Sequence, residues 1–241
     1  VHGPLMNKLQ TCYAISQDGT TAYMEMASAS GLTLVSIKDR NPLITTTYGV
    51  GEMVADAIKR GCQHIVMGIG GSATCDGGIG MIKALEENDC LSSSCRITVA
   101  CDVTNPLYGP NGAAYVFAPQ KGATPEQVIE LDNRLKQFAH DTENKGLASK
   151  EMVFYPGAGA AGGLGYALLT YLKAELKSGI DIVLDISNFD KALTESDLVI
   201  TGEGKSDHQT MMGKVPSGVL HLCKKRQTPV WLMSGSIDDT Q

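Results

Sequence analysis

Three glycine-rich segments hold most of the side chains that could support chemistry. They read Gly70-Gly71-Ser72-Ala73-Thr74-Cys75-Asp76-Gly77-Gly78, Pro156-Gly157-Ala158-Gly159-Ala160-Ala161-Gly162-Gly163 and Thr201-Gly202-Glu203-Gly204-Lys205-Ser206-Asp207-His208-Gln209-Thr210. Glycines gathered between a strand and a helix let the backbone approach a ligand closely, commonly a phosphate. The clustering therefore predicts phosphate chemistry more than it predicts ordinary turns.

The first segment follows an apolar strand predicted at residues 64–69 and leads into a helix predicted at 79–85. Backbone N–H groups at that helix start would face an anion. The predicted ligand contacts are Gly70, Gly71, Ser72, Ala73 and Thr74. Asp76 adds a carboxylate for a metal or for a hydroxyl proton, or else it simply caps the helix. The residues alone leave both interpretations of Asp76 open.

The second segment precedes a predicted apolar helix at 164–176. Its small residues either permit close packing or form an anion-binding helix start, and both remain open. The third segment follows a strand predicted at 197–201, and ligands of open α/β sheets gather at the carboxyl ends of strands. Its candidate functional residues are Gly202, Glu203, Gly204, Lys205 and Asp207.

Asp102 stands at the end of another predicted strand, residues 96–103. A carboxylate there suits Mg²⁺, which takes a few carboxylates together with phosphate oxygens and water. The alternative is a turn in which Asp102 accepts hydrogen bonds near Asn105 and Pro106.

Gly68-x-Gly70-x-x-Ala73 also matches a relaxed dinucleotide fingerprint, which would indicate a nicotinamide-dependent oxidoreductase. That fingerprint needs a second strand ending in an acidic residue about 20 residues later. The corresponding residues, 88–94, do not have a strand pattern. We therefore predict that no full βαβ unit follows this loop, and we rank NAD binding below phosphate binding.

Strand-like and helix-like segments alternate along the chain, which predicts an α/β fold with a mostly parallel sheet. Two hairpin-like stretches, 11–26 and 113–119, suggest that part of the sheet is mixed. Further strands are predicted at 181–186 and 229–233, and a helix at 52–60. Thr124, Pro125 and Gln127 form a capping box that starts another helix. A domain boundary is expected near residue 190.

The bulk composition, with 43% hydrophobic and 19% charged residues, is that of a globular protein. A net charge of −6 argues against a nucleic-acid partner. Seven cysteines without metal-like spacing suggest free thiols in a reducing, cytoplasmic setting. We expect no membrane association, because no apolar run approaches the length of a membrane span.

Six motifs, in order along nearly the whole chain, resemble type I (bacterial) glycerate kinases. Three of the motifs are the glycine-rich segments, and the other three are Ala100-Cys101-Asp102-Val103-x-Asn105-Pro106-Leu107, Gly109-Pro110-x-Gly112-Ala113 and Pro119-Gln120-Lys121-Gly122-Ala123. The resemblance implies a flavodoxin-like α/β domain, partly present as residues 191–241, and a larger α/β domain inserted into it, residues 1–190. It also implies ATP and Mg²⁺ as cofactors and D-glycerate as substrate, with 2-phosphoglycerate as the favoured product.

The resemblance further implies that the glycine loops hold the ATP phosphates, and that Asp102 and Glu203 are candidates for binding Mg²⁺. Asp207 would accept the substrate hydroxyl proton, with Asp76 as second choice. Lys205 would steady the glycerate carboxylate or the transferring phosphoryl group.

The chain departs from the family pattern at several places. The opening strand and loop of the family have no counterpart in residues 1–241, members carry a longer stretch near Leu85 and Glu86, and Cys75 stands where asparagine is usual. A catalytically silent sensor that binds glycerate or a nucleotide is the alternative function, and a homodimer is left open.

Overall fold

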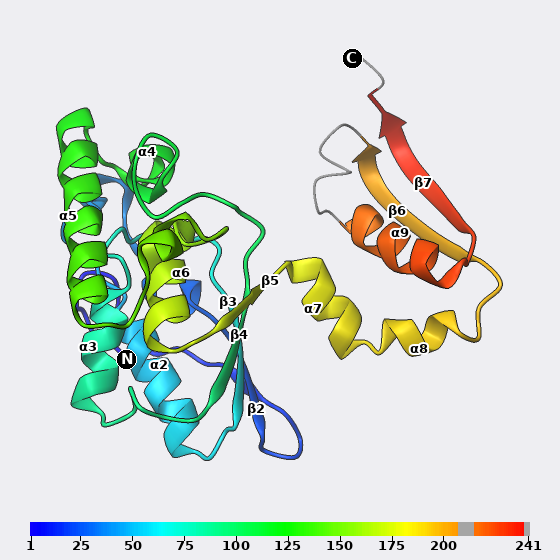
Figure 1. Cartoon of the computed structure of the whole chain (residues 1–241), viewed down its shortest axis with the longest axis horizontal. Helices are drawn as coiled ribbons and strands as arrows, with labels where there is room; N and C mark the ends of the chain where they lie inside the picture. Colours follow the sequence, from blue (N-terminus) through cyan, green and yellow to red (C-terminus); the bar gives the residue numbers. More distant parts are fainter. Residues whose placement is uncertain (207–214, 239–241) are drawn as a thin grey trace. The chain divides into compact units, whose positions relative to one another are not determined.

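The computed structural model describes residues 1–206 and 215–238, and it divides into two compact units. The larger unit is Val1–Leu176 and the smaller is Lys177–Gln241 (Figure 1). The chain thus changes unit after Leu176, whereas the sequence suggested a boundary near residue 190. Asp207, the predicted proton acceptor, lies outside the described residues.

The larger unit is built on a mixed five-stranded sheet in the order β1-β2-β3-β4-β5. Its strands are β1 (Ala14–Ile15), β2 (Thr21–Glu25), β3 (His64–Gly68), β4 (Arg96–Ala100) and β5 (Glu175–Lys177). Strands β2, β3 and β4 run parallel, with Gly68 opposite both Glu25 and Ala100, and β1 pairs antiparallel to β2. The predicted α/β class, mostly parallel with a mixed edge, is confirmed.

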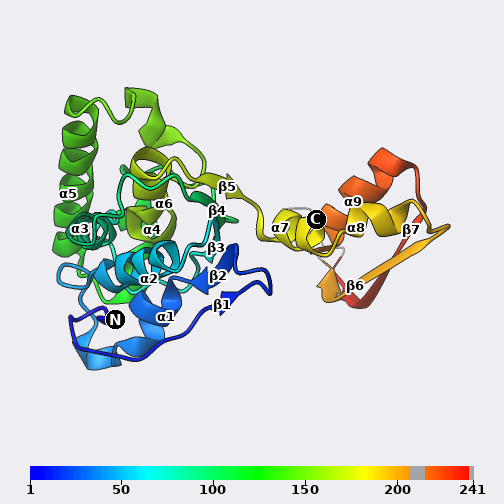
Figure 2. The same ribbon diagram turned by 90° about the horizontal axis from the view of Figure 1, so that it is seen from below.

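The helices of the larger unit cover one face of this sheet (Figure 2). They are α1 (Ala27–Ser30), α2 (Tyr48–Lys59), α3 (Ile79–Glu87), α4 (Ala113–Phe117), α5 (Pro125–Asn144) and α6 (Ala160–Tyr171), with short 3-10 turns η1 (Leu32–Leu34), η2 (Ile37–Asp39), η3 (Pro119–Lys121) and η4 (Lys150–Phe154). Every second strand residue points into the core that results, as the two-residue period of a strand requires. Ala22, Ile65 and Val99 are completely buried there.

Local sequence signals explain where several of these helices begin. The Thr124 hydroxyl accepts a hydrogen bond from the Gln127 backbone N–H, and the Gln127 side chain accepts one from Thr124, so the predicted capping box is present. Leu131 and Leu135 on the same helix are buried in the core.

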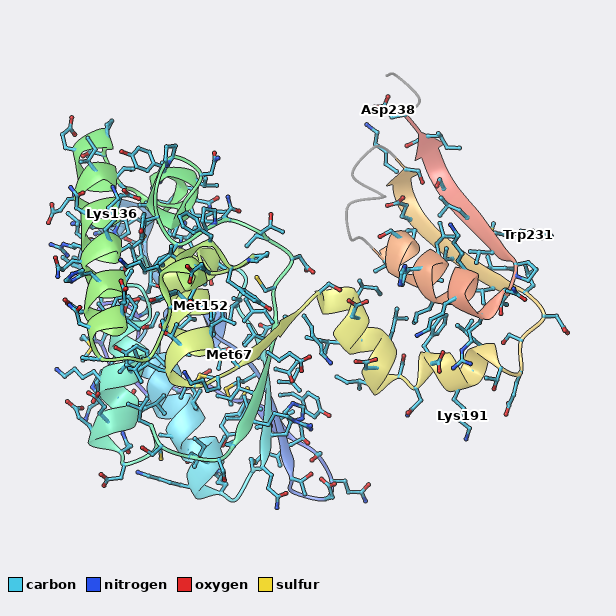
Figure 3. The ribbon with its side chains drawn as sticks, in the orientation of Figure 1. Met67, Lys136, Met152, Lys191, Trp231 and Asp238 are labelled. Atoms are coloured by element: carbon cyan, nitrogen blue, oxygen red, sulfur yellow. The ribbon has the colours of Figure 1, made fainter. Side chains whose placement is uncertain are left out.

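The smaller unit contains α7 (Gly179–Ile186), α8 (Phe189–Leu193), β6 (Val199–Ser206), α9 (Val215–Arg226) and β7 (Val230–Ile237). Strands β6 and β7 pair in parallel. Leu184, Leu193, Val219 and Cys223 form its small core. Trp231 on β7, labelled in Figure 3, is 63% exposed.

Two predicted strand segments are helical instead. Residues 181–186 belong to α7, because Ser178 caps the helix with its hydroxyl, which accepts a hydrogen bond from the Asp181 backbone N–H at 3.2 Å. The apolar run Ile182-Val183-Leu184 fits a strand or a helix, and the serine cap shows that it is helical. Residues 113–119 form α4 and the start of η3 rather than a hairpin.

The helix predicted at 164–176 ends at Tyr171, and β5 follows it. No described helix is long and apolar enough to cross a membrane.

Candidate functional site

A cavity of about 420 Å³ lies at the carboxyl ends of β3 and β4 in the larger unit. Its lining includes residues 69–72 after β3, residues 100–103 at the end of β4, Gln120 and Lys121 of η3, and Ala160 and Ala161 of α6. Parallel strands bring these loops to one edge of the sheet, which is where ligands of open α/β folds bind. The cavity thus joins parts of four of the six motifs singled out in the sequence.

The first glycine loop is fixed in place by backbone hydrogen bonds. The Leu32 N–H donates to the Gly71 carbonyl at 2.9 Å, and the Ala73 N–H donates to the Ser30 carbonyl at 2.8 Å. Gly71 has a φ of +71°, a conformation that favours glycine. At Gly70 an added Cβ would meet no atom within 4 Å, so that position faces open space.

The five predicted contacts of this loop divide into two groups. Gly70, Gly71 and Ser72 line the cavity. Ala73 and Thr74 are buried behind it and are not among the lining residues. The Thr74 hydroxyl oxygen is buried without a hydrogen-bond partner among the residues that the structure describes.

Lys121 is the charged residue that the sequence reasoning missed. The residue is among those that line the cavity although it is 2% exposed, and its Nζ donates to Ser72 Oγ and to the Thr74 carbonyl, both at 2.7 Å. Burial lowers the pKa of Lys121 to about 8, against a smaller opposing effect of Cys75 and Asp76. The available signal was a lysine inside the motif Pro119-Gln120-Lys121-Gly122-Ala123, to which the sequence assigned no role.

Asp102 is exposed and lines the same cavity, after β4. Within residues 1–206 and 215–238, no group of three or more His, Cys, Asp or Glu side chains could hold a metal. Mg²⁺ needs only one or two carboxylates when phosphate oxygens and water complete its shell. Asp102 therefore fits a metal that arrives with a phosphate ligand, and it does not fit a site made wholly of protein groups.

The Asp76 carboxylate accepts hydrogen bonds from other parts of the protein. Its Oδ2 accepts hydrogen bonds from the Thr47 N–H and hydroxyl, both at 2.9 Å, and from the Gly80 N–H at 3.2 Å, while Oδ1 accepts one from the Gly78 N–H. These contacts tie the start of α3 to the start of α2. The capping interpretation left open by the sequence is the one that this geometry supports.

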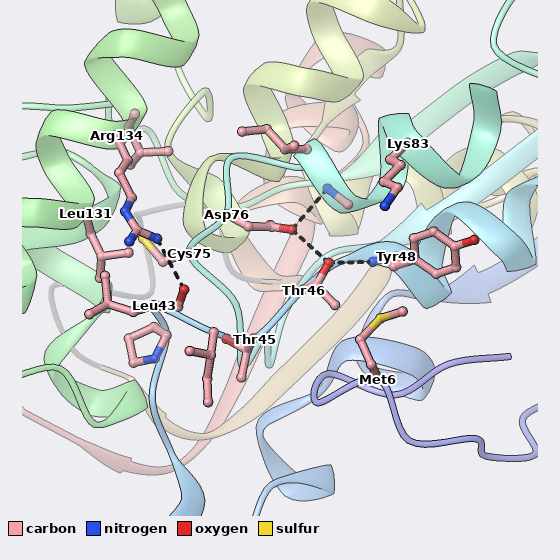
Figure 4. A pocket seen from close by; sticks show the side chains of 15 residues that line it. Met6, Leu43, Thr45, Thr46, Tyr48, Cys75, Asp76, Lys83, Leu131 and Arg134 are labelled. Atoms are coloured by element: carbon pink, nitrogen blue, oxygen red, sulfur yellow. Dashed lines mark hydrogen bonds between the residues drawn. The ribbon is translucent and has the colours of Figure 1, made fainter. Parts of the chain in front are cut away.

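Asp76 also lines a second cavity of about 430 Å³, shown in Figure 4. This cavity lies between α3, α5 and residues 42–48 and is largely apolar, with Lys83 and Arg134 among its polar residues. Arg134 donates to the Leu43 carbonyl at 3.2 Å and pairs with Glu130 on its own helix. Because this cavity includes one predicted site residue and the first cavity includes several, the first is the better candidate site.

The second glycine segment serves close packing. Ala161, Gly162 and Gly163 adopt left-handed backbone angles, which interrupt α6 at its start. A Cβ on Gly162 would lie 2.1 Å from the Thr74 carbonyl oxygen, and one on Gly159 would lie 2.1 Å from the Pro106 carbonyl oxygen. These glycines bring α6 against the backbone of the first glycine loop and of the loop after β4. Ala160 and Ala161 alone of this segment line the cavity.

Replacing Gly162 with alanine should lower the free energy of unfolding by at least about 2 kcal/mol, since left-handed strain and a backbone clash add together. Gly146→Ala is the matched control, because Gly146 has the same φ of +70° but open space around its added Cβ. Urea unfolding followed by circular dichroism would compare them. Equal losses for the two variants would contradict the packing role.

The third glycine segment differs from its prediction. Strand β6 does not stop at Thr201 but continues to Ser206, so that Gly202, Glu203, Gly204 and Lys205 are paired strand residues or their neighbours opposite β7. A Cβ on Gly202 would lie 2.8 Å from the Met233 carbonyl oxygen.

Two charged side chains of this segment, Glu203 and Lys205, have partners within the smaller unit. Lys205 pairs with Asp238 at 2.8 Å (Figure 3 labels Asp238), and the Ser206 hydroxyl donates to Glu203. Their predicted roles toward ligands stay predictions.

One argument from the sequence is wrong. A complete βαβ unit does contain the first glycine loop, since β3, α3 and β4 are consecutive and β3 pairs in parallel with β4. Its second strand is the one predicted at residues 96–103, and it was not counted toward the unit because it begins at Arg96, beyond the interval that the dinucleotide fingerprint prescribes. Asp102 follows this strand, but at a greater spacing from Gly70 than that fingerprint requires.

An α/β unit with a glycine loop, a buried lysine and an aspartate around one cavity is typical of proteins that bind small anionic ligands at their strand ends. The glycerate kinase family matches residues 1–90 and 86–241 of the chain. The two matches meet at residues 86–90, near the place where family members were expected to carry a longer stretch. The chain belongs to the glycerate kinase family.

Individual relatives agree. A protein of Escherichia coli K12 named glycerate 2-kinase is 45% identical, over 99% of this chain and 69% of its own length. The glycerate kinase of Bacillus subtilis 168 is 46% identical over 98% and 69%. The crystal structure of a Salmonella typhimurium LT2 protein described as a glycerate kinase aligns with a TM-score of 0.86 at 43% identity, covering 98% of this chain and 70% of that one.

Proposed function

We propose that this chain transfers the γ-phosphoryl group of ATP to a hydroxyl of D-glycerate, with 2-phosphoglycerate as the product. The observation that carries the proposal is the cavity at the ends of β3 and β4, where the glycine loop, Asp102 and Lys121 of separate family motifs meet. Membership in the glycerate kinase family supports the reaction class. The name of the Escherichia coli relative supports the 2-hydroxyl as acceptor.

Phosphoryl transfer needs little covalent chemistry from a protein, because catalysis rests on positioning and on neutralising charge. In this proposal Gly70, Gly71 and Ser72 contact phosphate oxygens of ATP, and Gly202 and Gly204 contact the nucleotide. Asp102 and Glu203 are the candidates for holding Mg²⁺, which would supply charge neutralisation on the phosphates. Asp207 accepts the hydroxyl proton and Lys205 steadies the glycerate carboxylate or the phosphoryl group. A homodimer stays a prediction.

Phosphorus NMR of the protein mixed with ATP, Mg²⁺ and D-glycerate tests the reaction and its acceptor at once. We expect ADP and the resonance of 2-phosphoglycerate to grow together, with no product when EDTA removes the metal. A 3-phosphoglycerate resonance would correct the acceptor hydroxyl. Absence of any product, with glycerate or ATP still raising the melting temperature, would favour the silent sensor instead.

A further inference from the structure

Lys121 is a buried lysine with no carboxylate partner among residues 1–206 and 215–238. Its printed hydrogen bonds go to a hydroxyl and to a carbonyl, both neutral groups. Among the residues that the structure describes, no carboxylate forms an ion pair with it. A buried ammonium without a counter-charge costs considerable free energy, and proteins rarely keep one without use.

The ammonium has a third N–H beyond the two that these bonds use. Lys121 is one of the residues that line the 420 Å³ cavity, so this remaining donor is the one we assign to a ligand there. Ser72, one of its two partners, lines the same wall. The lysine thus presents positive charge from beneath the glycine loop, at a place that water cannot easily screen.

From this geometry we infer that Lys121 is the anion anchor of the cavity, forming an ion pair with a negatively charged oxygen of a bound ligand. The inference rests on the proposed function for its choice of ligands, which are the carboxylate of glycerate and the phosphates of ATP. Both ligands present an anionic oxygen. Binding measurements with each ligand alone distinguish which of them pairs with Lys121.

Two ionisable groups act on the ammonium, namely Cys75 and Asp76 of the glycine loop. Asp102 lines the same cavity. Burial raises the pKa of the Cys75 thiol to about 11, so this group stays neutral near pH 8. The Asp76 carboxylate accepts hydrogen bonds from the Thr47 N–H and hydroxyl, and Asp102 is exposed.

Calorimetric titration of the Lys121→Met protein with D-glycerate, with ATP and with inorganic phosphate tests the inference. Methionine keeps the length of the side chain and removes the charge. We expect one of the two substrates to bind roughly 10- to 100-fold more weakly, the range for a lost charge-assisted hydrogen bond, and phosphate to weaken as well. Lys83→Met is the control, because Lys83 lines the other cavity and is largely exposed.

A pH series adds a readout that a structural role would not move. The pKa of Lys121 in the unliganded protein is about 8, so the side chain loses its charge above that pH. The affinity of the unmodified protein for anions should therefore fall about tenfold per pH unit above pH 8. Lys121→Met should abolish this dependence. As a second variant, Lys121→Ala should recover part of its affinity when n-butylammonium is added to refill the space.

The outcomes are distinct. Weaker glycerate binding identifies the carboxylate as the partner, and weaker ATP binding identifies a phosphate. Unchanged binding of all three probes by a folded Lys121→Met protein, or an equal loss in Lys83→Met, overturns the inference. Lysine-dependent binding of phosphate without any binding of glycerate or ATP would keep the anion anchor and reject the proposed function. No binding of any probe by the unmodified protein would reject both.

Discussion

Turnover of glycerate should fall roughly 100-fold or more when Gly70 is replaced by valine, while the fold is kept. Gly70 lines the cavity and an added Cβ there meets no protein atom within 4 Å. The backbone of Gly70 is not left-handed, so a side chain is not strained. Valine would therefore occupy space intended for the ligand. Steady-state kinetics by a coupled ADP assay would measure the loss.

Gly70→Ala serves as the graded control, because a single methyl group fills less of the cavity. We expect an intermediate loss of turnover, and circular dichroism and melting temperature should be close to the original for both variants. Full activity in the folded valine variant would place the ligand elsewhere, and the apolar cavity beside Arg134 would become the next candidate.

Removal of the Asp76 carboxylate should have the largest effect on stability. Asp76→Ala would leave the Thr47 N–H and hydroxyl without their acceptor, and Thr47 is completely buried. Each unsatisfied buried group costs about 1–3 kcal/mol. We therefore expect a loss of about 3 kcal/mol in the free energy of unfolding, measured by urea denaturation.

Asp18→Ala is a matched control for this change. The Asp18 carboxylate also accepts hydrogen bonds, from the Ser16 hydroxyl and from the N–H and hydroxyl of Thr20, but it does so in exposed surroundings. Water replaces it there, so the shift in the unfolding midpoint should be much smaller. A comparable shift in the two variants would show that the buried network does not depend on Asp76.

A second substitution of Asp76, Asp76→Asn, distinguishes a structural role of this residue from a catalytic one. Asp76→Asn keeps an oxygen acceptor, and turnover per folded molecule should stay within about tenfold of the original. Loss of a general base would instead cost about 10²–10⁴-fold. A loss of that size would restore Asp76 as a proton acceptor.

The sequence predicted the parts of the fold that depend on local signals. The capping box at Thr124 and the apolar strand at residues 64–69 are both present, because hydrogen bonds near in sequence and the alternation of buried residues define them. It failed at residues 181–186, where one capping serine outweighed an apolar pattern that fits either state.

The site was predicted in part for a similar reason. Glycine clusters reveal close backbone approach, but not whether the approaching group is a ligand or another loop. Gly70 faces the cavity, whereas Gly162 contacts the Thr74 carbonyl, and nothing in their immediate neighbours distinguishes them. Lys121 could not be chosen from the sequence, because its burial arises from contacts with Ser72 and Thr74, far away along the chain.

The placement of Trp231 on β7 gives the protein a built-in spectroscopic label. It is the one tryptophan of the chain, and it belongs to the smaller unit, whereas most of the helical residues belong to the larger. Indole emission therefore monitors residues 177–241 selectively, while the far-ultraviolet signal mainly follows residues 1–176. Heating or ligand titration observed at both wavelengths would reveal whether the two units melt, and respond to glycerate, together or one after the other.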